Sequence, residues 1–171
     1  MIITIAGFAG SGKTTLGKAL AAKLGYSLVS PTFKDLAKKE GIPLMEFQKK
    51  AEKDSSIDLK FDQVLKEQAS KGNCVVTTWL GPWMLNADWR IWLFAPLEIR
   101  AKRVAERDGI SIEQAVLQIK KREEQNRSRY LKLYGIDIFD TSGFDVSFNS
   151  GRFTPEQMAD LIVKITSSKK R

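Results

Sequence analysis

Histidine is absent from the 171 residues, and cysteine occurs once, at Cys74. Without histidine there is no imidazole to serve as a general base or as a zinc ligand. A single cysteine excludes an internal disulfide and offers no set of thiolate ligands for a metal ion. Any catalysis by this chain therefore depends on other side chains.

Long apolar runs are missing as well. No stretch approaches the roughly 20 apolar residues of a membrane span, and the first residues are typical of a strand rather than of a signal peptide. Hydrophobic residues make up 43% of the chain and charged residues 28%, which is ordinary for a globular protein. We expect one cytoplasmic domain, residues 1–171, with no membrane partner.

Acidic residues are fewer than basic ones. The chain has 28 Lys and Arg against 20 Asp and Glu, a net charge of +8, and a pI near 9.6. Such a balance suits nucleic acid, an acidic membrane surface or small phosphorylated ligands. Most lysines are scattered along expected helices and are interpreted as solvated, whereas the arginines cluster in one segment.

What the chain does have is a complete phosphate-binding motif. Residues 7–14 match G-x-x-x-x-G-K-[ST] at every position. The apolar, β-branched residues 1–6 predict a buried strand before it, and residues 13–24 predict a helix that ends at Gly25. A glycine turn that binds nothing is the alternative, but strand, loop and helix in this order favour a phosphate cradle.

The residue types in the motif explain the chemistry. Glycines let backbone N–H groups converge on an anion at a helix N-terminus. Lys13 is expected to reach the β- and γ-phosphates, and the Thr14 hydroxyl to ligate Mg²⁺. We expect a nucleoside triphosphate to bind at Gly7, Phe8, Ala9, Gly10, Ser11, Gly12, Lys13, Thr14 and Thr15.

Strands and helices alternate along the rest of the chain. This pattern predicts an α/β protein with the P-loop NTPase fold, a five-stranded parallel sheet with helices on both faces. Residues 31–70 are too long for a plain crossover and are expected to hold a second substrate, with a purely structural insertion as the alternative. Further strands are expected at residues 26–30, 74–78, 89–94 and 144–148, and helices at 33–39, from Pro43, and at 57–69, 97–108, 111–134 and from 155.

Two local expectations concern the less regular parts. Residues 79–84 are rich in aromatic residues and are expected to form a turn. The helix at 57–69 is expected to carry an apolar face built from Leu59 or Phe61, Val64, Leu65 and Gln68.

Arginines recur at helical spacing in the second half of the chain. At about 100° per residue, Arg122, Asn126 and Arg129 share one stripe of their helix, while Arg127 lies off it. Forked guanidinium groups on one face suit the charge that develops in phosphoryl transfer. The same spacing relates Arg100, Arg103 and Arg107 on the preceding helix.

A plain alternative explains the same arginines. A solvated helix would hold pairs such as Glu123–Arg127 at i,i+4 and need no ligand. Arg127 in particular is expected to be solvated or to touch ATP.

Taken together, these residues resemble the nucleoside monophosphate kinases, specifically the short archaeal type of cytidylate kinase. The resemblance covers nearly the whole chain and is most specific at 107–129 and at the Tyr134-Gly135-Ile136-Asp137 sequence. It implies transfer of the γ-phosphoryl of ATP to CMP or dCMP with Mg²⁺, residues 31–70 as the monophosphate-binding arm, and roughly 107–129 as a lid.

The resemblance also implies roles for individual residues. Arg107 resembles a lid arginine that touches ATP, and Arg122 and Arg129 resemble the catalytic pair that grips the transferring and acceptor phosphates together with Lys13. The residues expected to bind the acceptor are Lys34, Trp79, Asn126, Arg122 and Arg129.

The chain departs from the family pattern in two places. Thr77-Thr78-Trp79 stands where the family usually has an acidic residue, a glycine and an arginine, and Lys34 stands where arginine is common. Both changes affect the acceptor site, and Trp79 is expected either to stack on a base or to pack in the core.

Two alternatives follow from these departures. The acceptor could be another monophosphate or small molecule, or the protein could be a nucleotide-dependent RNA-binding protein. No recognisable RNA-binding module is present, so no nucleic-acid partner is expected, and the chain is expected to be a monomer.

Overall fold

The computed structural model describes residues 1–43, 46–47, 50–51 and 54–168, without the side chains of residues 33 and 34. Within them, five strands form one parallel sheet in the order β2-β3-β1-β4-β5. The predicted fold class is therefore confirmed. The strands are β1 (Ile2–Ala6), β2 (Ser27–Val29), β3 (Cys74–Val76), β4 (Trp89–Phe94) and β5 (Val146–Asn149).

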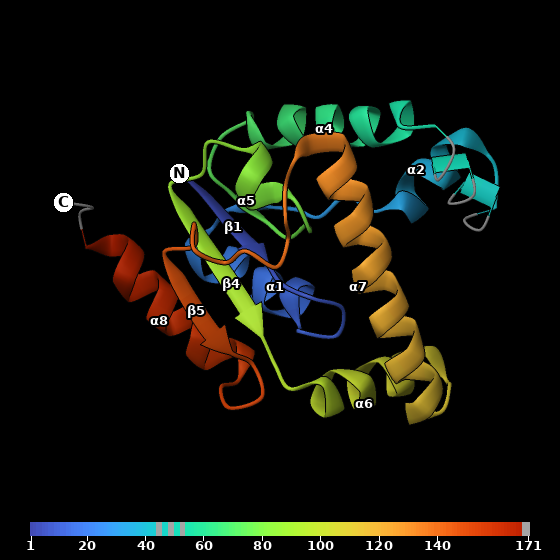
Figure 1. The fold of residues 1–171 in the computed structure, drawn as a ribbon. Coiled ribbons are helices and arrows are strands. Elements are labelled where there is room, and N and C mark those ends of the chain that lie inside the picture. The colour runs from blue at the N-terminus through green and yellow to red at the C-terminus, as the bar shows by residue number, and fades with distance from the viewer. Residues whose placement is uncertain (44–45, 48–49, 52–53, 169–171) are drawn as a thin grey trace.

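Helices cover both faces of this sheet (Figure 1). They are α1 (Lys13–Leu24), α2 (Phe33–Glu40), α4 (Ser56–Ala69), α5 (Gly81–Met84), α6 (Leu97–Asp108), α7 (Ile112–Tyr134) and α8 (Pro155–Ser167). The pair α1 and α8 packs on one face, while α4 and α5 contact the other. None of the described helices has the length and hydropathy needed to cross a bilayer.

The alternation of side chains along the strands creates two cores. Ile3 and Ile5 of β1 point to the α1/α8 face, where they are fully buried with Leu16 and Leu20. Cys74 and Val76 of β3 point to the opposite face and pack against α4. Strands buried on both faces read as continuous apolar runs, which is why the sequence predicts them well.

Helix ends follow the capping signals in the sequence. Ser111 and Gln114 form a reciprocal capping box at the start of α7, and Thr154 and Gln157 form another at the start of α8. The expected turn at 79–84 is wrong in part, because residues 81–84 form the short helix α5. Pro82 in its first turn has a backbone already suited to a helix.

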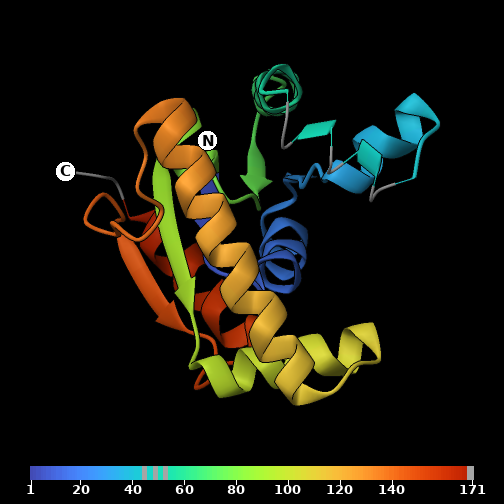
Figure 2. The same cartoon turned by 45° about the vertical axis from the view of Figure 1, so that its right-hand side comes forward.

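Two pairs of helices, α6 with α7 and α2 with α4, lie over the sheet edge where the strands end. Figure 1 shows α7 running diagonally from α6 up to α4, and Figure 2 shows the same helix from another side, with α4 viewed nearly end-on. The hydroxyl of Tyr134, the last residue of α7, donates a hydrogen bond to Asp62 of α4, so the two pairs meet there. The helix expected from Pro43 falls largely outside the described residues.

Candidate active site

A cavity of about 1820 Å³ lies at the carboxyl edge of the sheet. Its walls come from the loop before α1, the segments after β2, β3 and β5, and the inward faces of α4, α6 and α7. In open parallel sheets, ligands bind at this edge. Pockets for a single small ligand measure roughly 300–1,000 Å³, so this cavity has room for a donor and an acceptor together.

The phosphate loop is held in a shape that requires glycine. Gly10 and Gly12 have φ values of 77° and 92°, in the left-handed region. A Cβ at Gly10 would also lie 2.7 Å from the carbonyl oxygen of Arg100. Because Gly12 is the N-cap of α1 and has no side chain, the first N–H groups of this helix stay available to an anion.

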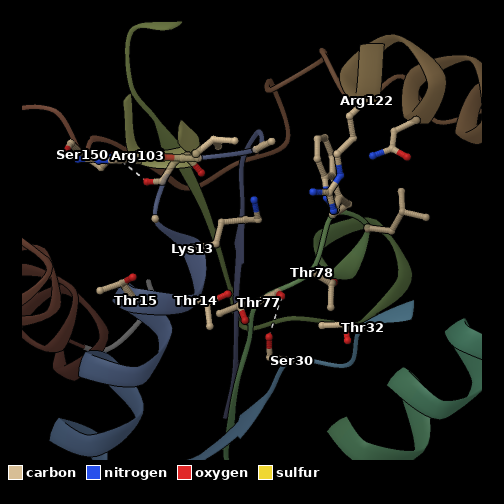
Figure 3. Close-up of a pocket in the computed structure, with 18 of the residues that line it drawn as sticks. Lys13, Thr14, Thr15, Ser30, Thr32, Thr77, Thr78, Arg103, Arg122 and Ser150 are labelled. Atoms are coloured by element: carbon tan, nitrogen blue, oxygen red, sulfur yellow. Dashed lines mark hydrogen bonds between the residues drawn. The ribbon is translucent and has the colours of Figure 1, made fainter. Parts of the chain in front are cut away.

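Lys13 lies among positive charges at the centre of the cavity. Figure 3 shows its side chain between Arg103 and Arg122. Its ammonium donates hydrogen bonds to the carbonyl oxygens of Gly7 at 2.6 Å and Phe8 at 3.0 Å. Burial, followed by the charges of Arg122 and Arg100, lowers the pKa of Lys13 to about 7. A polyphosphate would supply the negative charge that favours the protonated amine.

Hydroxyl groups gather beside Lys13. Thr14 and Thr15 are exposed at the start of α1, and Thr77 and Ser30 approach from the ends of β3 and β2 (Figure 3). The buried Oγ1 of Thr77 has no hydrogen-bond partner within the described part of the chain. Mg²⁺ keeps several waters and needs few protein ligands beside phosphates, so these oxygen donors fit a hydrated Mg²⁺.

No acidic cage for a metal accompanies them. Among the residues that the structure describes, no group of three or more His, Cys, Asp or Glu side chains is placed to hold an ion. A magnesium ion here would therefore depend on the nucleotide for most of its negative ligands.

The predicted arginine stripe faces the cavity. Arg122, Asn126 and Arg129 all line it from α7. The guanidinium carbon of Arg122 lies 5.7 Å from the ring centroid of Trp79, and Nζ of Lys13 lies 5.2 Å from the same centroid. Arg129 lies farther along the helix, with its Nη2 atom 3.6 Å from Oδ1 of Asp58.

The other arginines of this helix pair do not behave as the simple solvated alternative predicts. The solvated alternative offered the pair Glu123–Arg127, but Glu123 forms a buried ion pair with Arg100 of α6. Arg127 instead makes two hydrogen bonds to Asp137, at 3.0 and 2.7 Å, outside the cavity wall. Tertiary contacts to α6 and to the segment after α7 have replaced the local i,i+4 pair.

Arg100 and Arg103 hold the phosphate loop from α6. Arg100 donates to the carbonyl oxygen of Ala9 at 3.2 Å, and Arg103 donates to that of Gly10 at 3.3 Å. Arg103 also donates to both oxygens of Ser150, at 2.9 Å for Oγ and 2.6 Å for the carbonyl. The loop is thereby tied both to α6 and to the segment after β5.

The remaining predicted site residues fall in three places. Arg107 lines the cavity but donates two hydrogen bonds of 2.7 Å to its neighbour Asp108. Gly7 and Phe8 lie behind the cavity wall, and the Phe8 ring packs edge-on against Trp92. The side chain of Lys34 lies outside the described part of the structure. The residues of the prediction that line the cavity are Ala9, Gly10, Ser11, Gly12, Lys13, Thr14, Thr15, Trp79, Arg107, Arg122, Asn126 and Arg129.

The structure adds acidic residues that the sequence interpretation missed. The expected apolar face of α4 is wrong at Leu59, whose surface is 59% exposed. Asp58 and Asp62 are buried instead and line the cavity. Their signal was present in the sequence, because both carboxylates share the i, i+4, i+7 stripe with Leu65. The buried residues of α4 are Ile57, Asp58, Asp62, Leu65 and Ala69.

Comparison with known proteins identifies the family of this chain. Residues 2–152 match the Cytidylate kinase-like family. The cytidylate kinase of Pyrococcus horikoshii is 48% identical over 159 residues, 91% of this chain and 83% of that protein. The cytidylate kinase of Sulfolobus acidocaldarius is 42% identical, over 99% of this chain and 96% of its own.

A solved structure supports the fold. The shikimate kinase of Acinetobacter baumannii superposes with a TM-score of 0.64 at 18% identity, covering 99% of this chain and 95% of its own. That likeness concerns the P-loop kinase fold alone. The family match and the archaeal relatives go further, and together they show that this chain belongs to the cytidylate kinase-like family.

Proposed function

We propose that the protein transfers the γ-phosphoryl group of ATP to CMP or dCMP, giving CDP or dCDP and ADP. One observation carries the proposal: a single cavity joins a complete phosphate loop to the arginines of α7 and to a polar pocket on α4. The archaeal relatives named cytidylate kinase indicate which monophosphate is the acceptor.

The residues near α1 serve the donor. Backbone N–H groups of residues 9–15 hold the β- and γ-phosphates, and Lys13 bridges them as the charge shifts toward ADP. Arg107 extends this site from the end of α6. Thr14 is the expected protein ligand of Mg²⁺, which neutralises phosphate charge when bound.

The transfer itself needs positioning more than covalent chemistry. An oxygen of the CMP phosphate forms a bond to the γ-phosphorus while the bond to the β,γ-bridging oxygen breaks. Arg122, next to Lys13, is placed to stabilise the transferring group. Arg129 and Asn126, two turns and one turn farther along α7, are placed to hold the acceptor.

The monophosphate-binding arm and the lid are assigned from the residues that each contributes to the cavity wall. Residues 31–70 include α4, which supplies the far wall of the cavity, and residues 107–129 include most of its arginine face. Trp79 stands where the family usually has an arginine and packs beside Lys13 and Arg122. Lys34 is kept as an acceptor contact from the sequence alone.

The proposal is tested by measuring ADP release with CMP, dCMP, UMP, AMP and GMP as acceptors at fixed ATP and Mg²⁺. We expect the highest kcat/KM with CMP or dCMP. Highest activity with a different monophosphate, or ADP release that does not depend on any acceptor, would contradict it.

A further inference from the structure

Two carboxylates are buried on the arm at the far end of the cavity from Lys13. Asp58 is 5% exposed and Asp62 is 6% exposed, one turn apart on α4. Asp62 has a partner, because the hydroxyl of Tyr134 donates to it.

Asp58, unlike Asp62, has a buried oxygen without a hydrogen-bond partner among the described residues. Its Oδ1 atom is 3.6 Å from Arg129, too far for a hydrogen bond, and its buried Oδ2 has no hydrogen-bond partner in the described part of the chain. Burial raises the pKa of Asp58, with Arg129 opposing that shift. Leaving a buried carboxylate oxygen unpaired costs free energy, so native proteins rarely keep one without a purpose.

Asp58 of α4 faces Arg129 of α7, and the position of Arg129 along α7 indicates which part of a ligand Asp58 meets. Arg122 is next to the phosphate loop, and Arg129, which neighbours Asp58, is two turns away, about 10 Å along the helix. An acceptor whose phosphate lies between these two arginines and the loop extends its nucleoside toward α4. Trp79 lies beside Lys13, at the end of the cavity where the phosphates would bind, so it is not the residue that contacts the acceptor base at α4.

We propose that Asp58 reads the acceptor base by accepting a hydrogen bond from the 4-amino group of cytosine. The inference rests on the proposed function and adds the residue that selects the base. Cytosine presents a donor at this position, whereas uracil presents a carbonyl oxygen. A carboxylate facing that oxygen would have two acceptors opposed and no proton between them.

Ligands that differ only at position 4 test this in the wild-type protein. Binding of CMP, UMP and 2-pyrimidinone ribonucleoside monophosphate, which lacks any 4-substituent, is measured by titration calorimetry. We expect both analogues to bind about 10²-fold more weakly than CMP, the scale of one lost charge-assisted hydrogen bond. Equal binding of CMP and the 2-pyrimidinone analogue would overturn the inference.

A pair of matched variants tests the residue. Asp58→Asn keeps the shape and can offer an amide N–H to uracil, so the CMP:UMP ratio of kcat/KM should fall by about 10²-fold while KM for ATP stays the same. Asp62→Asn, equally buried one turn away, should keep the wild-type ratio even if it lowers stability.

The outcomes separate the two proposals. A wild-type enzyme that phosphorylates CMP, with a ratio unaltered in Asp58→Asn, overturns the role of Asp58 and leaves the kinase function standing. A wild-type protein that phosphorylates no monophosphate overturns the function and this inference with it. If Asp58→Asn fails to fold, the calorimetric series on the wild type decides.

Discussion

Arg122 lies over the indole of Trp79, with its guanidinium carbon 5.7 Å from the ring centroid. Lys13 is also close to that ring, with Nζ at 5.2 Å. The electron-rich face of the indole offsets part of the repulsion between the two cations and keeps them near the place where a γ-phosphate would lie. The ring of Trp79 thus organises the two cations beside it.

Replacing this ring tests its role. Trp79→Leu removes the aromatic face and should lower kcat by about 10-fold, the scale of two weakened cation–π contacts. Trp79→Phe keeps an aromatic face and should retain most of the activity. The measurement is steady-state kinetics at saturating ATP and CMP; equal kcat for Trp79→Leu and Trp79→Phe would show that the ring only fills space.

The lowered pKa of Lys13 predicts proton uptake on nucleotide binding. With a pKa of about 7, the amine is mostly neutral at pH 8, and the phosphates favour its protonated form. Binding should therefore take up a proton at pH 8, and affinity should fall as the pH rises above about 7. Calorimetry of ADP binding at pH 8 in two buffers of different ionisation enthalpy measures the uptake.

Lys13→Arg is the control, because arginine stays charged throughout this range. The variant should bind ADP without the buffer-dependent heat. Wild-type heats that do not depend on the buffer would contradict a neutral lysine in the free protein.

The buried pair of Arg100 and Glu123 predicts a large effect on stability. Removing the negative partner leaves a buried guanidinium uncompensated, so Glu123→Gln should lower the free energy of unfolding by about 3 kcal/mol. Asp137→Asn, which breaks the more exposed pair with Arg127, should cost less than about 1 kcal/mol. Urea unfolding of both variants makes the comparison, and equal losses would contradict it.

The two cavity arginines of α7 should act as a unit. Arg122→Ala and Arg129→Ala should each lower kcat by about 10²-fold, as expected for one preorganised donor. The double variant should lose less than the product of the two effects. Single-turnover kinetics separates this loss from substrate binding, and wild-type rates in both single variants would show that the stripe is not catalytic.

Local patterns predicted most of the fold. Residues 89–94 and 97–108 have the same bounds in the sequence analysis and in the structure, because an apolar run followed by Pro96 and a helix closed by Gly109 leave little choice. The order of the strands in the sheet and the contact between α7 and α4 depend on tertiary packing, so local sequence patterns could not predict them.

The candidate site was predictable only where a motif spans neighbouring residues. The phosphate loop and the Arg122–Arg129 stripe are of this kind. Asp58 was missed because apolar periodicity assigned the buried face to Leu59 or Phe61, and a helix that lines a ligand cavity breaks this rule. The Glu123–Arg127 pair of the solvated alternative does not form, and sequence spacing cannot show that Arg100 approaches Glu123 from another helix.

Following the label from γ-³²P-ATP tests the central claim most directly. With CMP and Mg²⁺, the protein should move the label into the β-phosphate of CDP in amounts equal to the ADP formed. Lys13→Ala should fold but transfer almost none. Label released as inorganic phosphate, or Lys13→Ala transferring at the wild-type rate, would contradict phosphoryl transfer from ATP to CMP at this cavity.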